Sequence, residues 1–189
     1  MRTTVLLIAI ALGMTAVSGN NNAPASAVNL GTQGATRFSS VYSALTKCGS
    51  GMTKKEEREA EKQGTNIPSK CKGYGGYVVD ISYSACASNI AVQKGEENIP
   101  LAMQTLDFKQ KTVEWRLANG KPFAVIMRVY EYSGNDLCAT GGKTTGESLI
   151  VKGLKGYENI DGEVKVKGTP NPNLKAREIA DQGYAKSKS

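Results

Sequence analysis

The sequence predicts a single α+β domain, in which a mainly antiparallel, twisted sheet or small β-barrel is joined to a C-terminal helix and stabilised by disulfides. Three observations predict this fold. Short segments alternate apolar and polar residues, an Asn-Gly pair separates two of them, and a helical pattern lies near the end of the chain. The chain has 189 residues, which is enough for one domain with its own core and short for two.

The first 27 residues have the pattern of a secretory signal peptide. Arg2 supplies the positive start, Val5–Leu12 is apolar, and Ala25-Ser26-Ala27 provides small residues at a cleavage site, with an earlier site over 15–19 as the alternative. The apolar run is shorter than the roughly 20 residues of a spanning helix. The sequence therefore predicts a periplasmic or secreted protein without a transmembrane segment after cleavage.

Composition sets the expected boundaries of the folded part. Small polar residues precede residue 38, so we expect a flexible lead-in over 28–37 and one β-rich domain over 38–184. The last residues, 185–189, are small or basic and are expected to fray.

Cys48, Cys71, Cys86 and Cys138 form an even set in a chain expected to be exported, where disulfides are the usual outcome. Four cysteines allow three connectivities, and we favour Cys48–Cys71 with Cys86–Cys138. The first bond would close a loop with 22 residues between the cysteines, a constraint worth roughly 3 kcal/mol in the chain-entropy model. A nucleophilic role is disfavoured because the chain has no histidine to activate a thiol.

The first half of the domain is expected to contain one solvated helix. Residues 40–43 fit either a short strand or a helical turn. Thr53 and Glu56 fit a capping box at the start of a helix over 53–62. This helix has no large apolar residue, so it cannot bury a face. We expect it to lie in solvent, held at its base by the first disulfide.

Strands are predicted on both sides of the middle of the chain. Alternation over 77–84 predicts a half-buried strand, with 87–92 as its partner and 94–98 as a loop. A hairpin is predicted over 112–132, because Asn119-Gly120 suits a type I′ turn. Its second strand is apolar on both faces and is therefore expected to be central in the sheet.

The two-residue turn also predicts the register of this hairpin. It pairs Trp115 with Ala124 and Val113 with Ile126. Residues directly opposite each other share one face, so these four side chains are expected to form part of the core.

The C-terminal part is expected to add two strands and a helix. Leu149–Val151 begins one strand, Asp161-Gly162 marks a turn, and 163–167 alternates with lysines outward, as a protected edge strand does. Asn171 is expected to cap a helix that ends before Gly183. Its narrow buried face is predicted to contain Ala176, Ile179 and Ala180.

The chain resembles an uncharacterised family of small exported bacterial proteins. Three segments carry the resemblance: Cys71-Lys72-Gly73-Tyr74-Gly75-Gly76, Val113-Glu114-Trp115-Arg116-Leu117 with Gly120-Lys121-Pro122-Phe123-Ala124-Val125-Ile126, and Asn171-Pro172-Asn173-Leu174-Lys175-Ala176-Arg177-Glu178-Ile179-Ala180-Asp181. The resemblance implies a shared fold. It implies no activity and assigns no catalytic residue.

Charge and composition exclude several classes of function. Without histidine there is no Ser-His-Asp triad, no Cys-His pair and no histidine metal ligand, and we expect no metal and no cofactor. The net charge of +7 falls to +6 when residues 1–27 are removed, and the basic residues are spread along the chain. A nucleic-acid-binding protein would concentrate them on one element. This charge favours an anionic envelope component as partner, with another exported protein as the alternative.

Three short motifs suggest chemistry, and each has a simpler structural reading. Gly141-Gly142-Lys143-Thr144 is part of a phosphate-loop pattern, but the glycine expected at 137 is a leucine. The Ser-x-x-Lys match at 69–72 lies between a proline and a glycine-rich turn, where a helix is disfavoured. Glu114 and Glu131 could serve as acid and base in glycan cleavage, but Glu114 is expected to pair instead with Arg116 or Arg128 on the sheet.

The sequence therefore names no catalytic residue. Its candidate binding surface consists of Tyr74, Arg116, Arg128 and Tyr130, because tyrosines and arginines on a sheet can hold sugars, peptides or anionic groups. The leading hypothesis is an exported, non-catalytic binding or envelope-associated protein. The alternatives are a periplasmic enzyme inhibitor of the lysozyme-inhibitor type and a hydrolase that uses carboxylates or a Ser-Lys pair.

Overall fold

The computed structural model describes residues 35–106, 109–134, 137–138 and 143–188. Its helices and strands are β1 (Phe38–Ala44), α1 (Lys54–Lys62), β2 (Ser69–Lys72), β3 (Val78–Tyr83), β4 (Ala87–Lys94), β5 (Glu97–Thr105), β6 (Thr112–Ala118), β7 (Lys121–Tyr132), β8 (Thr144–Gly153), β9 (Asp161–Lys165) and α2 (Pro172–Lys186). The predicted signal peptide at 1–27, the lead-in up to residue 34, and Gly141 and Gly142 of the Gly-Gly-Lys-Thr motif lie outside the described residues.

The strands form two antiparallel sheets. A five-stranded sheet has the order β1-β6-β7-β8-β9, and a four-stranded sheet has the order β2-β3-β4-β5. The prediction of an antiparallel α+β fold with a C-terminal helix is confirmed. A small barrel, the alternative, is wrong because the two sheets remain separate and do not close on each other.

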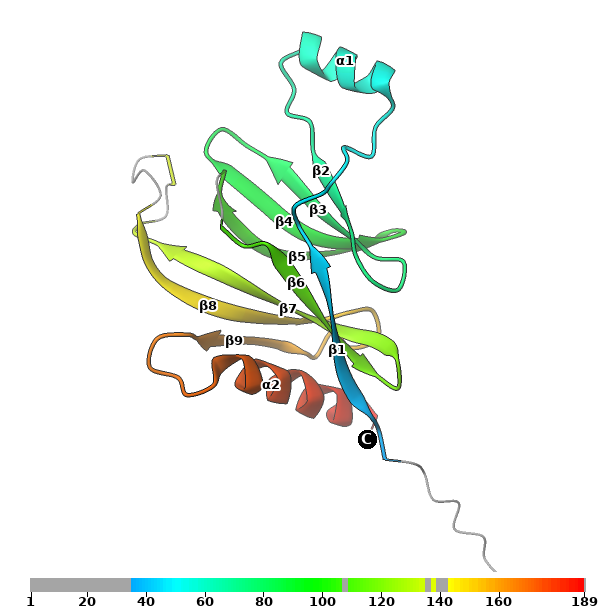
Figure 1. The fold of residues 1–189 in the computed structure, drawn as a ribbon, viewed down its shortest axis with the longest axis vertical. Coiled ribbons are helices and arrows are strands. Elements are labelled where there is room, and N and C mark those ends of the chain that lie inside the picture. The colour runs from blue at the N-terminus through cyan, green and yellow to red at the C-terminus, as the bar shows by residue number, and fades with distance from the viewer. Residues whose placement is uncertain (1–34, 107–108, 135–136, 139–142, 189) are drawn as a thin grey trace, which may run out of the picture. The chain divides into compact units, whose positions relative to one another are not determined.

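The two sheets face each other across the larger of two cores (Figure 1). Trp115 and Met127 from the five-stranded sheet pack there with Val79, Ile90 and Val92 from the four-stranded sheet, and all five side chains are fully buried. The indole N–H of Trp115 donates to Ser43 Oγ at 2.9 Å, so the one polar atom of this large side chain is satisfied.

The smaller core lies between the other face of the five-stranded sheet and α2 (Figure 1). Ala176 and Ala180 are fully buried there, and Ile179 packs beside them, as predicted. Small residues on the helix allow its backbone to approach the sheet closely. The protein therefore has three layers, and β7 is central and buried on both faces, as its apolar sequence predicts.

The turn of the β6–β7 hairpin is as predicted, but its register is not. Asn119 and Gly120 both have positive φ, at 49° and 79°. A β-bulge inserts one extra residue into β7 before Ala124, so Trp115 faces Val125 and not Ala124. The predicted shared face is therefore wrong: Trp115 lies in the core between the sheets, and Ala124 lies in the core beneath α2.

The extra residue at this bulge is Phe123. Its ring packs against Tyr184 of α2, with ring centroids 4.8 Å apart. Its carbonyl oxygen accepts a hydrogen bond from the backbone N–H of Leu154 at 2.9 Å. The bulge therefore gains an aromatic contact on the helix side and leaves this carbonyl satisfied.

Several predicted strands are found with shifted limits. Residues 40–43 belong to a strand, β1, and β3 pairs with β4 as expected. The expected loop at 94–98 is a two-residue turn that leads directly into β5, a strand that the sequence did not indicate. Asp161-Gly162, predicted as a turn, begins the edge strand β9.

Both favoured disulfides, Cys48–Cys71 and Cys86–Cys138, are present. The first lies beside the point where the backbones of Gly49 and Lys70 form an isolated β-bridge, so it closes the base of the segment that carries α1. That helix begins with the predicted capping box and buries one residue, Ala60. Figure 1 shows α1 beyond the end of β2, away from the strands.

The ends of α2 differ from the prediction. Asn171 adopts a left-handed conformation and makes no side-chain cap hydrogen bond. Gly183, expected after the helix, lies inside it, and the helix continues to Lys186, into the segment 185–189 predicted to fray. The reason is packing, because a Cβ built on Gly183 would lie 2.5 Å from Cγ1 of Ile160. Glycine is needed at this position for close contact, and does not mark the helix end.

Among the described residues, no helix has both the length and the apolar character needed to cross a membrane.

This close contact predicts an unusual effect of a helix-favouring substitution. Replacing a glycine inside a helix by alanine ordinarily stabilises by about 1 kcal/mol. Gly183→Ala is expected to destabilise by about 1–3 kcal/mol because Ile160 must move. Urea denaturation measures the change. In an Ile160→Ala background the same substitution should be neutral or stabilising, and a stabilising effect in the wild type would contradict the packing.

Candidate functional site

A polar pocket lies between the first turns of α2 and the face of the five-stranded sheet that α2 covers. Its volume is about 240 Å³. We call it the helix pocket, and its lining residues are Tyr42, Gln110, Thr112, Glu114, Ile126, Arg128, Leu149, Asn173 and Arg177. Beside the pocket, α2 is held to the sheet by charged side chains as well as by its narrow apolar stripe.

The first of these charged contacts joins Glu114 of β6 to Arg177 of α2. Arg177 Nε donates to Glu114 Oε1 at 2.6 Å, and Nη2 donates to Oε2 at 3.2 Å, so the pair is bidentate. Ser40 and Tyr42 also donate to this carboxylate, at 2.6 Å and 3.2 Å. The Glu114 side chain is 9% exposed, and all its neighbours in this network are donors.

These donors set the ionisation of both partners. Burial by itself would raise the pKa of Glu114, but the hydrogen bonds from Arg177, Ser40 and Tyr42 and the charge of Arg177 hold that pKa below its ordinary value. The carboxylate raises the pKa of the Arg177 guanidinium in return. The pair is therefore fully charged at neutral pH.

A second contact joins the sheet to the middle of α2. Arg116 Nε and Nη2 donate to the two carboxylate oxygens of Asp181 at 2.8 Å and 2.6 Å, and Nη1 donates to Ser40 Oγ at 3.0 Å. The guanidinium also lies 5.6 Å from the ring of Phe38. Arg116 is thus committed to holding α2.

The third arginine on this face is bound differently. Arg128 Nη1 donates to Glu147 Oε2 at 2.8 Å, and the two side chains are 27% and 39% exposed. Both residues lie in the sheet, so this pair does not hold the helix. The other N–H groups of Arg128 donate to no described residue. Arg128 therefore lines the helix pocket, and its remaining guanidinium N–H groups can donate to a ligand.

The candidate binding residues are only partly brought together. Arg128 lines the helix pocket, and Tyr130 lies two residues along β7 on the same face. Arg116 is on that face but bound to Asp181. Tyr74 lies in the turn between β2 and β3 and packs against the core between the sheets, apart from the other three.

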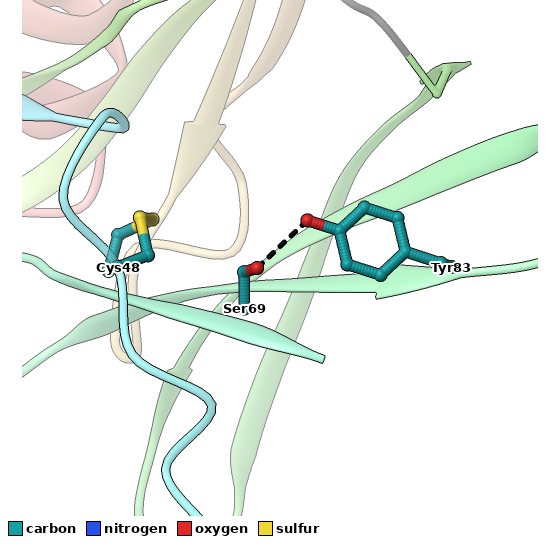
Figure 2. Close-up of a disulfide and its surroundings, with 4 residues drawn as sticks. Cys48, Ser69 and Tyr83 are labelled. Atoms are coloured by element: carbon teal, nitrogen blue, oxygen red, sulfur yellow. Dashed lines mark hydrogen bonds between the residues drawn. A yellow bond between two sulfur atoms is a disulfide. The ribbon is translucent and has the colours of Figure 1, made fainter. Parts of the chain in front are cut away.

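The Ser-x-x-Lys match at 69–72 does not form a catalytic pair. Ser69 and Lys72 lie three residues apart on β2, so they point to opposite faces. Figure 2 shows Ser69 hydrogen-bonded to the hydroxyl of Tyr83, at 2.8 Å, beside the Cys48 disulfide. Neither side chain of the Ser-x-x-Lys match therefore faces the other.

Glu131 lies on the face of the five-stranded sheet opposite to Glu114. Ser148 donates to its carboxylate, and Lys165 lies 2.9 Å away. These two hydrogen bonds lower the pKa of Glu131. The two glutamates do not face one substrate and are not arranged as the acid and base of a glycosidase. Glu114 also pairs with neither predicted arginine, since its partner is Arg177.

Within the described part of the chain, no three His, Cys, Asp or Glu side chains gather in a way that could hold a metal ion.

The sequence did not indicate that α2 contributes to this site. Arg177 and Asp181 are four residues apart, so they lie on one face of a helix. Glu114 and Arg116 are two apart, so they lie on one face of a strand. This matched spacing of opposite charges is the signal that would have indicated the pairing of the two elements.

Comparison of the chain with protein-family models, with curated proteins and with solved structures finds no match.

The buried glutamate predicts a pH-dependent contribution to stability. Because the pKa of Glu114 is lower in the folded chain than its ordinary value of 4.5, its stabilisation is complete above about pH 5 and is lost as the pH falls through the folded value. Glu114→Gln should cost about 2 kcal/mol at pH 7. That cost should shrink towards pH 3, as measured by urea denaturation at each pH.

The half-exposed Glu147 provides a matched control. Glu147→Gln should cost less than about 1 kcal/mol at pH 7. A Glu114→Gln cost that stays constant from pH 7 to pH 3 would show that ionisation of this carboxylate does not hold α2.

Proposed function

We propose that the protein is an exported, non-catalytic binding protein that holds a carboxylate group of an envelope component or of another exported protein in the helix pocket. One observation carries the proposal: Arg128 lines a pocket of about 240 Å³ and uses one donor for the partly exposed Glu147. A guanidinium with open donors in a concave site is suited to a planar, bidentate acceptor.

The charge of the lining favours a carboxylate over a more highly charged group. Arg128 and Arg177 are positive and Glu114 is negative, which gives the lining a net charge of +1; Glu147, the partner of Arg128, lies outside the lining and would have to release Arg128 to a ligand. A carboxylate with one negative charge balances it, whereas a phosphate monoester with nearly two would leave excess charge. The uncharged lining residues Gln110, Thr112 and Asn173 add groups that can hydrogen-bond to a neighbouring amide or hydroxyl.

The state of Glu114 supports a binding role over catalysis. Its oxygens accept hydrogen bonds from Arg177, Ser40 and Tyr42, and its pKa is lowered. A general acid needs a raised pKa, and a general base needs an oxygen free to take a proton from the substrate. Glu114 suits neither role, because its oxygens are occupied by donors from α2 and β1.

Export is supported by the cysteines and the predicted leader. All four cysteines are paired, and such bonds persist in oxidising compartments. Together with the signal-peptide pattern of residues 1–27, this supports a periplasmic or secreted location. The resemblance to small exported bacterial proteins predicts the same location.

The proposal is tested with two peptides that differ in one group, acetyl-Ala-Ala-Ala with a free C-terminal carboxylate and the same peptide as its amide. Calorimetry on the mature chain should show tighter binding of the acid. Arg128→Gln should weaken binding of the acid at least about tenfold, since charge-assisted hydrogen bonds are lost. Arg58→Gln on the exposed helix α1 removes the same charge and should leave binding unchanged within about twofold.

A third variant gives a change of opposite sign. Glu147→Gln should strengthen binding of the acid, because the ligand no longer competes with Glu147 for Arg128. Equal binding of the acid and the amide would contradict the proposal, as would an acid preference that survives Arg128→Gln. Cleavage of peptidoglycan that disappears in Glu114→Gln would contradict a non-catalytic role.

A further inference from the structure

A second concave site lies at the side of the two packed sheets where β5 is the edge strand. It is bounded by the β4–β5 turn, by the beginning of β5, and by the loop over 154–160 that joins β8 to β9. We call it the edge cleft. Its volume is about 510 Å³, about twice that of the helix pocket.

The floor of the edge cleft is apolar. Leu154 and Ile160 are 1% and 2% exposed, and Ile99 and Pro100 of β5 complete the apolar lining. An apolar floor of this size with a few polar groups at its edge is the usual form of a ligand site.

A short hydrogen-bond chain holds the two walls together. Glu97 at the start of β5 accepts from the hydroxyl of Tyr77 at 3.0 Å and from the backbone N–H of Lys155 at 2.7 Å. Tyr77 is itself buried and packs against Trp115, with ring centroids 5.6 Å apart. The cleft is therefore fixed by contacts that reach the core between the sheets.

The charge at this site is opposite to that of the whole protein. The lining contains four carboxylates, from Glu96, Glu97, Glu158 and Asp161, and two ammonium groups, for a net charge of −2. One ammonium, Lys152, is bound to both oxygens of Asp161 at 2.8 Å. The chain as a whole carries +7. A cationic group would therefore be attracted to the cleft in spite of the overall charge.

The edge of β5 offers backbone groups to the same occupant. In a two-residue hairpin the residues that flank the turn, Lys94 and Glu97, bond to each other, so the next residue, Asn98, directs its N–H and C=O away from β4. Pro100 lies two residues further on and has no N–H to offer, which limits pairing along this edge to a short stretch.

We infer that the edge cleft binds a short extended peptide segment that carries a lysine or an arginine. The peptide backbone would pair with Asn98, the aliphatic stem of the basic side chain would lie on Ile99 and Pro100, and its charged end would meet Glu96 and Glu158 at the rim. A purely polar cation would leave the apolar floor unused, and a purely apolar segment would leave the carboxylates unpaired. This inference does not depend on the helix pocket.

The probe is acetyl-Ala-Val-Lys-Val-Ala-amide, which has no carboxylate and therefore does not test the helix pocket. Its comparison peptide replaces lysine by norleucine, which keeps the apolar stem and removes the charge. Fluorescence titration at low salt should show that the lysine peptide binds at least about fivefold more tightly. Binding should weaken as salt is added.

The matched variants each remove two exposed carboxylates. Glu96→Gln/Glu158→Gln should weaken binding of the lysine peptide about fivefold, whereas Glu59→Gln/Glu61→Gln on α1 should change it less than about twofold. Thermal melts check that both variants are folded.

Three results would overturn the inference: equal binding of the lysine and norleucine peptides, an equal loss in the two double variants, or full displacement of the peptide by an equal concentration of spermidine. The last would show that charge alone accounts for binding. Arg128→Gln should bind the lysine peptide as the wild type does.

Discussion

The β-bulge at Phe123 determines which side chains of β7 face which layer. The five-stranded sheet is packed on both faces, so the apolar residues of its central strand between Phe123 and Val129 each lie in one core or the other. Without the extra residue, Trp115 would oppose Ala124, and Arg128 would point between the sheets. With it, Val125 and Met127 enter that core, and Arg128 faces α2. The bulge thus places the Arg128 guanidinium on the face that α2 covers, where it lines the helix pocket.

The helix that covers this face is held by two kinds of interaction. Its apolar stripe is narrow, with Ala176 and Ala180 at its centre, and Gly183 lets it lie close to Ile160. Apolar contact alone would leave its position along the sheet weakly determined. The Glu114–Arg177 and Arg116–Asp181 pairs set that position, because bidentate pairs have narrow geometric limits. Removing either partner would leave a poorly solvated charge, which costs more than the pair gains.

Local sequence patterns predicted what depends on neighbouring residues. The capping box at Thr53, the Asn119-Gly120 turn and the apolar character of β7 each describe a few adjacent residues, and each prediction is confirmed. The bulge at Phe123 is not predicted from local sequence, because the contacts that the extra residue makes, with the ring of Tyr184 and the backbone N–H of Leu154, lie far away in the chain.

The candidate site is predicted only in part, because local patterns do not show contacts between distant segments of the chain. Arg128 is predicted as a binding residue because arginines and tyrosines on a sheet can hold sugars, peptides or anionic groups. Arg177 was missed because the contact that brings it to Glu114 spans 63 residues. The strand β5 was missed because Pro100 and polar neighbours interrupt the alternation that indicates a strand.

We propose that Arg128 is available to a ligand, whereas Arg116 and Arg177 are committed to the fold. Nitrogen-15 NMR of the arginine Nε–Hε groups tests it directly, during titration of the mature chain with acetyl-Ala-Ala-Ala. We predict that the Arg128 signal shifts with saturation and that the Arg116 signal stays in place. Shifts of equal size for Arg116 and Arg128, or no shift of the Arg128 signal at saturating peptide, would contradict this role of Arg128.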